Sequence, residues 1–207
     1  MRSKSERMIV RSCSGAGFLI LGGIAVNDTA CMIDAGYLQK VLADYEKPKI
    51  DYQKLVAEMT NNLGLLRTYY YDCKSYMSLN PTENERERQA RQEKFHKYLQ
   101  RLPQFECRFG RLEKRWNEDG SCSFEQKRVD VMLSLDLATL STKRLIRRAV
   151  LMTGDSDMIP AIQIAKNEGV IVELFCIPKS THHELLQAVD IATPINQAFI
   201  DRIKAEN

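Results

Sequence analysis

The amino-acid sequence predicts an α/β fold, in which helices cover both faces of a mostly parallel β-sheet. Short apolar runs alternate with amphipathic segments along most of the chain, and the stretch 149–176 reads as a strand, a helix and a second strand in quick succession. Such a unit favours parallel strands joined by a right-handed crossover. With 207 residues, the chain is long enough for one domain with a substantial core.

The strand–helix–strand unit carries two aspartates at its first junction. The buried run 149–152 is the first strand, and 170–176 is the second. Asp155 and Asp157 lie between the first strand and the helix, at the carboxyl end of a strand, where open α/β sheets bind their ligands. Asp157, or its neighbour Ser156, is expected to cap the helix.

The spacing of these two aspartates favours a metal-binding role over capping alone. Two carboxylates within three residues repel each other at neutral pH, and a bound cation removes that repulsion. A helix cap at Asp157 gives no role to Asp155. We therefore expect at least one of the pair to bind a metal ion.

The remaining elements follow from apolar periodicity and from turn residues. The predicted strands are 31–34, 65–72, 105–109, 149–153 and 170–176. The predicted helices are 37–43, 51–63, 81–101, 126–140, 184–188 and 196–204, in addition to the helix after Asp157. The helix 81–101 mixes acidic and basic residues at helical spacing, which is typical of a solvated face with ion pairs. A hairpin or arm is expected over 110–124, around the turn Asp119-Gly120.

Composition and charge limit the classes of function only loosely. The net charge of +3 permits an anionic partner without requiring one. None of the six cysteines forms a C-x-x-C pair, so we expect reduced thiols rather than a zinc site or a disulfide framework. Residues 1–28 join a basic start to a short apolar stretch that cannot span a bilayer. We expect them to form an extra strand or a poorly ordered extension rather than a signal peptide, and the protein to be cytoplasmic.

The segment 126–140 carries two further aspartates. Its apolar residues repeat at helical spacing and mark the buried stripe: Val129, Leu133, Leu137 and Leu140. Asp136 falls on this stripe and must be paired, hydrogen-bonded or metal-bound, because an unpaired buried charge is costly. Lys127 is the nearest basic candidate. Asp130 lies near the amino end of the helix, where the helix dipole favours a carboxylate.

The aspartates at strand ends are expected to meet. Asp34 ends the strand 31–34, and Asp155 follows another strand. If these strands are neighbours, Asp34, Asp130, Asp155 and Asp157 converge on one point. Such a set binds Mg²⁺ or Mn²⁺ through carboxylate oxygens and water. Because no His, Cys or Ser is placed to act as a nucleophile, hydrolysis by an activated water is the chemistry that this set allows.

The predicted arm combines basic residues with the single tryptophan. Arg111, Lys114 and Arg115 precede Trp116. Such an arm could stack a base and hold phosphates. A tryptophan that anchors the loop to the core explains the same residues equally well.

Several ordered motifs resemble the NYN domain, in the LabA-like branch of the PIN-like nuclease superfamily. They are Ile33-Asp-Ala-Gly-Tyr-Leu38, Gln126-Lys-Arg-Val-Asp-Val-Met-Leu-Ser-Leu-Asp136, Val150-Leu-Met-Thr-Gly-Asp-Ser-Asp-Met-Ile-Pro160 and Gly169-Val-Ile-Val172. The resemblance runs from about Thr29 to Ala192 and implies a three-layer α/β/α sandwich that occupies 29–207. Tyr37 and Leu38 stand where many members carry an asparagine, and Met158 stands where many carry a phenylalanine.

The resemblance implies a metal-dependent ribonuclease, cleaving single-stranded or looped RNA with Mg²⁺ or Mn²⁺. Its acidic residues map onto Asp34, Asp130, Asp155 and Asp157. Asp34 and Asp155 would ligate the metal, and the other two would add ligands or orient water. The expected supporting residues are Asp136, Lys127, Ser156 and Thr153. The expected nucleic-acid contacts are Arg111, Lys114, Arg115, Lys127 and Arg128.

Other functions remain open at this point. A regulatory module that binds nucleic acid, a nucleotide or a protein without cleavage could keep the same residues. DNA as a substrate and the oligomeric state also stay open. A phosphoaspartyl phosphatase is disfavoured, because no second aspartate follows Asp34 by two residues, and a topoisomerase-primase site would need a glutamate there.

Overall fold

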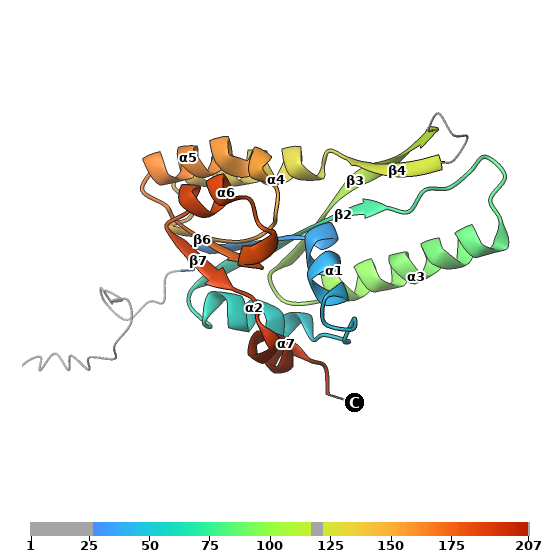
Figure 1. The fold of residues 1–207 in the computed structure, drawn as a ribbon, viewed down its shortest axis with the longest axis horizontal. Helices are drawn as coiled ribbons and strands as arrows, with labels where there is room; N and C mark the ends of the chain where they lie inside the picture. Colours follow the sequence, from blue (N-terminus) through green and yellow to red (C-terminus); the bar gives the residue numbers. More distant parts are fainter. Residues whose placement is uncertain (1–26, 117–121, 207) are drawn as a thin grey trace, which may run out of the picture.

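The computed structural model describes residues 27–116 and 122–206, and it confirms the predicted three-layer α/β/α fold (Figure 1). Seven strands form one sheet in the order β4-β3-β2-β1-β5-β6-β7. Six of them are parallel, and the edge strand β4 is antiparallel to β3. The strands are β1 (Thr29–Asp34), β2 (Leu65–Lys74), β3 (Phe105–Trp116), β4 (Cys122–Lys127), β5 (Arg148–Met152), β6 (Ile171–Cys176) and β7 (Ile191–Pro194).

Helices cover both faces of this sheet. α4 and α5 lie on one face, and α2, α3 and α7 lie on the other (Figure 1). The helices are α1 (Ala35–Ala43), α2 (Tyr52–Thr60), α3 (Glu83–Gln100), α4 (Val129–Thr142), α5 (Ile159–Asn167), α6 (His183–Ala188) and α7 (Gln197–Ile203). Two short 3₁₀ turns, η1 (Ser156–Met158) and η2 (Pro178–Ser180), precede α5 and α6. The central strands β1 and β5 are almost entirely buried, as apolar runs covered on both faces should be.

The order of the strands reverses between β1 and β5. From β1 the chain moves outward to β2 and β3, whereas from β5 it moves in the opposite direction to β6 and β7. β1 pairs with β5 from Thr29↔Arg148 to Ile33↔Met152. Asp34 and the residues after Met152 therefore lie together at the carboxyl edge, at the switch point where α/β sheets bind ligands.

Side-chain caps explain where several helices begin. Asp34 caps α1, and Asp51 caps α2 by accepting hydrogen bonds from two backbone amides. Thr82 and Glu85 form a reciprocal capping box at the start of α3. Each cap satisfies amide groups that have no partner within the helix.

The predicted hairpin is present, and the helix after it begins later than predicted. β3 and β4 form the expected hairpin, although its turn at Asp119-Gly120 lies outside the described residues. The helix predicted over 126–140 begins only at Val129, because Gln126 and Lys127 extend β4 by pairing with β3. Arg128, with φ of 78°, makes the left-handed turn between the strand and the helix.

The capping prediction at Asp157 is wrong. A 3₁₀ turn precedes α5, and Asp155 caps that turn by accepting a hydrogen bond from the Asp157 amide. Met158 precedes α5 without a side-chain cap. The short edge strand β7 was not predicted, because its four residues lack a distinct apolar pattern.

Two sequence-based expectations concern regions that the structure covers only in part. The prediction for residues 1–28 falls almost entirely outside the described residues. Within 27–116 and 122–206, no helix has the length and apolar character needed to cross a membrane. Among the described residues, Cys31, Cys73, Cys107 and Cys176 are not in disulfide bonds.

Candidate functional site

Asp34 is held at the carboxyl end of β1 by the start of α1. Its Oδ1 accepts hydrogen bonds from the amides of Gly36, at 2.8 Å, and Tyr37, at 3.3 Å. Within the part of the chain that the structure describes, no group hydrogen-bonds to its Oδ2. The cap therefore fixes the side chain and leaves one oxygen for a ligand.

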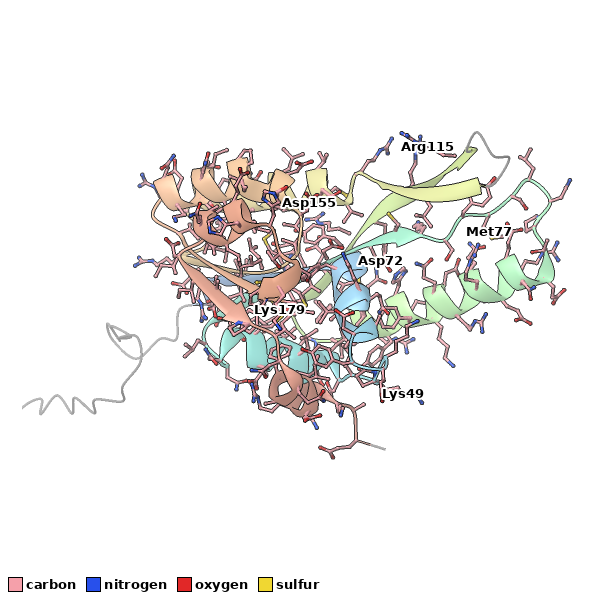
Figure 2. All side chains as sticks on the ribbon, in the orientation of Figure 1. Lys49, Asp72, Met77, Arg115, Asp155 and Lys179 are labelled. Carbon is pink, nitrogen blue, oxygen red and sulfur yellow. The ribbon has the colours of Figure 1, made fainter. Side chains whose placement is uncertain are left out.

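Asp155 is held in a similar way after β5. Its Oδ1 accepts a hydrogen bond from the Asp157 amide at 2.9 Å, and its own amide donates to Thr153 Oγ1 at 3.2 Å. Thr153 is buried, and Ser156 is half-buried in the same turn. Figure 2 labels Asp155 beside the start of α4. Both aspartates thus combine a capping bond with a place at the switch point.

An open cavity of about 380 Å³ joins these aspartates to Asp130 at the start of α4. The cavity is lined by Asp34, Gly36, Tyr37, Lys40, Asp130, Gly154, Asp155 and Ser180. Asp157 is exposed and does not line the cavity. Three of the four predicted acids therefore meet in one place, and the fourth lies beside them.

Burial and neighbouring carboxylates raise the pKa values of Asp34 and Asp130. Burial, together with the charges of Asp130 and Asp155, raises the pKa of Asp34 from 3.8 to about 6. Burial and the charges of Asp155 and Asp157 raise the pKa of Asp130. Among the side chains that the structure describes, no lysine or arginine forms an ion pair with Asp34, Asp130 or Asp155. Within that set, no ion pair offsets the repulsion among these acids.

The donor atoms suit a hard divalent cation, with a limit on how many bind directly. Among the residues that the structure describes, no three acidic, histidine or cysteine side chains are gathered closely enough to hold one ion. Mg²⁺ usually keeps several waters and takes only one or two carboxylates directly. The residues therefore fit an ion bound by two carboxylates, with the others reached through water.

Tyr37 of α1 contacts two loops at the cavity, the one after β5 and the one after β6. Its hydroxyl accepts a hydrogen bond from the Ile177 amide at 3.1 Å and lies 3.4 Å from Thr181 Oγ1. Its ring lies so close to Gly154 that a Cβ there would come within 2.5 Å of a ring carbon. The glycine after β5 is therefore required by the approach of this ring.

Asp136 lies in a different environment. The Tyr71 hydroxyl donates a hydrogen bond to its Oδ2 at 2.9 Å, and Arg108 Nε lies 3.3 Å from the same oxygen. These partners come from β2 and β3, and the side chain of Lys127, the candidate from the sequence, lies outside those described. Asp136 therefore ties α4 to the sheet and does not line the cavity.

The predicted basic contacts are spread along the hairpin. Arg128 is exposed beside Asp130, and Arg111 is exposed further along β3. Figure 2 shows Arg115 on the outer part of the hairpin, well apart from Asp155. Nothing is described for the Lys114 side chain. Of the predicted basic contacts whose side chains the structure describes, Arg128 alone stands beside one of the acids, and the Lys127 side chain is also outside those described.

Sequence reasoning missed two polar residues of the cavity, Lys40 and Ser180. Lys40 follows Gly36 by four residues on α1 and so shares its face, a spacing that could have indicated it. Ser180 lies in η2 after β6, and its position depends on contacts far apart in the sequence.

The comparison with protein families gives a match to the NYN domain over residues 28–196. The chain belongs to the NYN domain family. This is a PIN-like family with an assigned nuclease role, and its members are typically metal-dependent. The match covers β1 to β7 and includes all the cavity residues.

Two individual proteins resemble this NYN domain. An uncharacterised protein, y4oD, from Sinorhizobium fredii is 43% identical over 53 residues, which span 26% of this chain and only 25% of that protein. The crystal structure of a protein of unknown function, VPA0982, from Vibrio parahaemolyticus matches with a TM-score of 0.58. That match covers 86% of this chain and 97% of the other at 18% identity, so it shows a shared fold alone.

Proposed function

We propose that this NYN domain is a metal-dependent endoribonuclease that hydrolyses phosphodiester bonds in single-stranded or looped RNA. The observation that carries the proposal is the cavity at the switch point, where burial and neighbouring carboxylates raise the pKa of Asp34 to about 6. A site that concentrates negative charge in this way is suited to a divalent cation. Membership of the NYN family supports the same chemistry.

The roles of the acids follow from how each is held. Asp34 and Asp155 ligate Mg²⁺ or Mn²⁺, because a capping bond fixes each side chain through Oδ1. Asp130 and Asp157 hold metal-bound waters or orient the attacking water. When bound, the cation lowers the pKa of a water and offsets negative charge on the leaving oxygen.

Other residues of the cavity position the RNA. Lys40 is exposed at the cavity and is its one cation among the described residues, so it binds the phosphate next to the cleaved bond. Arg128 is placed to contact a neighbouring phosphate. Tyr37 holds the loop that carries Ser180 against the acids.

The test is cleavage of labelled RNA by the full chain with Mn²⁺ or Mg²⁺, with and without EDTA. Replacing Asp155 with asparagine should lower the rate on the order of 100-fold or more, because the cap persists while the charge is lost. The matched control is Asp44→Asn, at an exposed residue after α1. Cleavage that survives both EDTA and Asp155→Asn would falsify the proposal.

One observation favours a second function, a binding module without turnover. In the ranges that the structure describes, the acids are not gathered as a three-ligand site. Such a module should gain thermal stability with Mn²⁺ and bind RNA, yet leave every RNA intact. Product formation in the presence of Mn²⁺ decides between the two functions.

A further inference from the structure

A second cavity, of about 250 Å³, lies beside the carboxyl end of β2, between that strand, β3 and α3. In Figure 1 this is the region where α3 and the β3–β4 hairpin project from the rest of the molecule. The residues that matter for its chemistry are Lys74, Gln92, Glu93, His96, Lys97 and Phe109. None of them lines the acidic cavity, which is the cavity at Asp34, Asp130 and Asp155 described above.

The inner wall of this cavity is fixed by hydrogen bonds within the protein. His96 is only 7% exposed, and its Nε2 lies 2.8 Å from Asp72 Oδ2, at a residue labelled in Figure 2. Gln92 Oε1 accepts from the Ser75 amide at 2.7 Å, and its Nε2 donates to the Cys73 carbonyl at 2.7 Å. The wall is thus formed in advance of any ligand.

One side of the cavity is aromatic. The Phe109 ring is half-buried, and its centroid lies 4.5 Å from that of His96. Lys74 Nζ lies 5.5 Å from the Phe109 centroid. Since this lysine is exposed and long, an entering planar group can displace its ammonium from the ring face. An aromatic ring of this kind is a stacking surface for a nucleobase.

The charge at the mouth favours an anionic ligand. Lys74 and Lys97 are exposed there, and Glu93 is the only carboxylate among the lining residues. Gln89 Nε2 donates a hydrogen bond to Glu93 Oε1 at 3.0 Å, which disperses that negative charge. Two cations beside an aromatic ring match a base with its attached phosphate.

The size and position of the cavity restrict the ligand further. Its volume is below the ~300–1,000 Å³ of pockets for drug-sized ligands, so it suits a single base rather than a base pair. It lies at the carboxyl end of β2, which neighbours β1, the strand that ends at Asp34. Since β1 and β2 are parallel neighbours, both cavities lie at the carboxyl edge of the sheet, where one RNA strand can extend from one to the other.

We propose that this cavity binds one unpaired nucleotide of the RNA, with its base stacked on Phe109 and its phosphate paired with Lys74 or Lys97. The inference rests on the proposed ribonuclease function and adds a substrate-binding site to it. It also explains why the substrate is single-stranded, since a base held in a duplex cannot enter.

The stacking part is tested by binding of a short fluorescent oligoadenylate to the full chain carrying Asp155→Asn, in EDTA. In that background, Phe109→Leu should weaken binding about tenfold, whereas Phe109→Tyr, which keeps a ring, should restore it. The matched control is Tyr98→Leu, at an aromatic residue of α3 that is 46% exposed and outside the cavity. Equal binding by the Phe109→Leu and Tyr98→Leu variants overturns the proposal.

The phosphate part is tested by the salt dependence of the same binding. Replacing both Lys74 and Lys97 with glutamine should make the slope of log Kd against log salt shallower by about 0.7, the value for one phosphate contact on a single strand. The control Lys94→Gln, at an exposed lysine of α3 outside the cavity, should leave the slope unchanged. Identical slopes for the two variants contradict the phosphate contact.

Cleavage by the wild-type chain separates this proposal from the proposed function. If RNA is cleaved but Phe109→Leu binds normally, the second cavity is not a nucleotide site and the ribonuclease stands. If Phe109→Leu weakens binding but no RNA is cleaved with Mn²⁺, the nucleotide site stands and the ribonuclease fails.

Discussion

Acids beside the central strands β1 and β5 have two different kinds of charged neighbour. Glu173 of β6 is 5% exposed, forms an ion pair with Arg148 of β5, and accepts a hydrogen bond from Thr193 Oγ1 at 2.6 Å. Asp34, at the end of β1, has Asp130 and Asp155 as its charged neighbours, and burial together with these charges raises its pKa. The first acid is buried with a cation from the protein, and the second is half-buried among other acids.

This difference separates a structural role from a binding role. A buried charge is tolerated when the fold supplies a partner and hydrogen bonds, as it does around Glu173. The acids at the switch point lack such a partner in the part of the chain that the structure describes, so their repulsion acts against folding. Under the proposed function, a cation from solution is the missing partner, and the two regions should then respond oppositely to charge removal.

The largest expected difference comes from removing one carboxylate charge in each region. Glu173→Gln should lower the free energy of unfolding by about 3 kcal/mol, because it leaves the Arg148 guanidinium, only 19% exposed, without its counter-charge. Asp155→Asn should leave that free energy unchanged or raise it slightly, because asparagine keeps the cap and relieves repulsion. Urea denaturation at neutral pH compares them, and equal losses would remove the distinction.

The sequence predicted the fold and the meeting of the acids more fully than the details around them. β1, β5 and β6 were predicted because buried parallel strands are continuous apolar runs, whereas β2 was predicted from its aromatic residues and β3 from its alternating pattern. Asp34 and Asp155 were predicted as site residues because each lies at or just beyond the carboxyl end of such an apolar run. These are local signals, so a single sequence contains them.

The missed features depend on contacts between distant residues. Asp136 finds its partner in Arg108, which is brought close by the pairing of β2 with β3 rather than by helical spacing. Gln126 and Lys127 join β4 because β3 offers a free edge, although their pattern suits a helix equally well. The cap at Asp155 rather than Asp157 follows from a 3₁₀ turn that periodicity does not distinguish from the start of a helix.

A cation should reverse the destabilisation at the switch point. At neutral pH, Mn²⁺ at about 100 times its Kd should stabilise the native state by about 2.7 kcal/mol. Asp34→Asn and Asp155→Asn should each remove most of this gain, whereas Glu173→Gln should keep it. Thermal unfolding with and without Mn²⁺ measures the effect. A gain that persists in both aspartate variants would mean that the ion binds elsewhere.

The raised pKa of Asp34 predicts a specific pH dependence. Its pKa is about 6 in the native state, against 3.8 ordinarily, so the native state holds a proton that the unfolded chain has released. The stability from this group is therefore present below about pH 4 and is lost as the pH rises to about 6, on the order of 2–3 kcal/mol.

Asp34→Asn isolates this contribution. Urea midpoints measured in metal-free buffer between about pH 4 and 7 should fall more steeply for the wild type than for the variant. Exposed acids with lowered pKa values, Glu85, Asp201 and Glu206, act in the opposite direction at lower pH and are common to both proteins. Parallel curves for the two proteins would show that Asp34 ionises normally.

The smallest expected effect tests whether Asp136 has a structural role or acts with the acids of the switch point. Asp136→Asn keeps an acceptor for the Tyr71 hydroxyl and loses only the charge pair with Arg108, whose side chain is 40% exposed, so unfolding should become easier by about 0.5–1 kcal/mol. Asp136→Leu should lower the free energy of unfolding by about 1–3 kcal/mol, because the buried Tyr71 hydroxyl is left without an acceptor.

Cleavage of RNA by Asp136→Asn should match the wild type, since this residue does not line the acidic cavity. If Asp136→Asn lowered the cleavage rate as far as Asp155→Asn does, Asp136 would act with the acids of the switch point. An acid with a partner in the protein would then also serve the reaction, and the presence of a partner would no longer distinguish structural acids from functional ones.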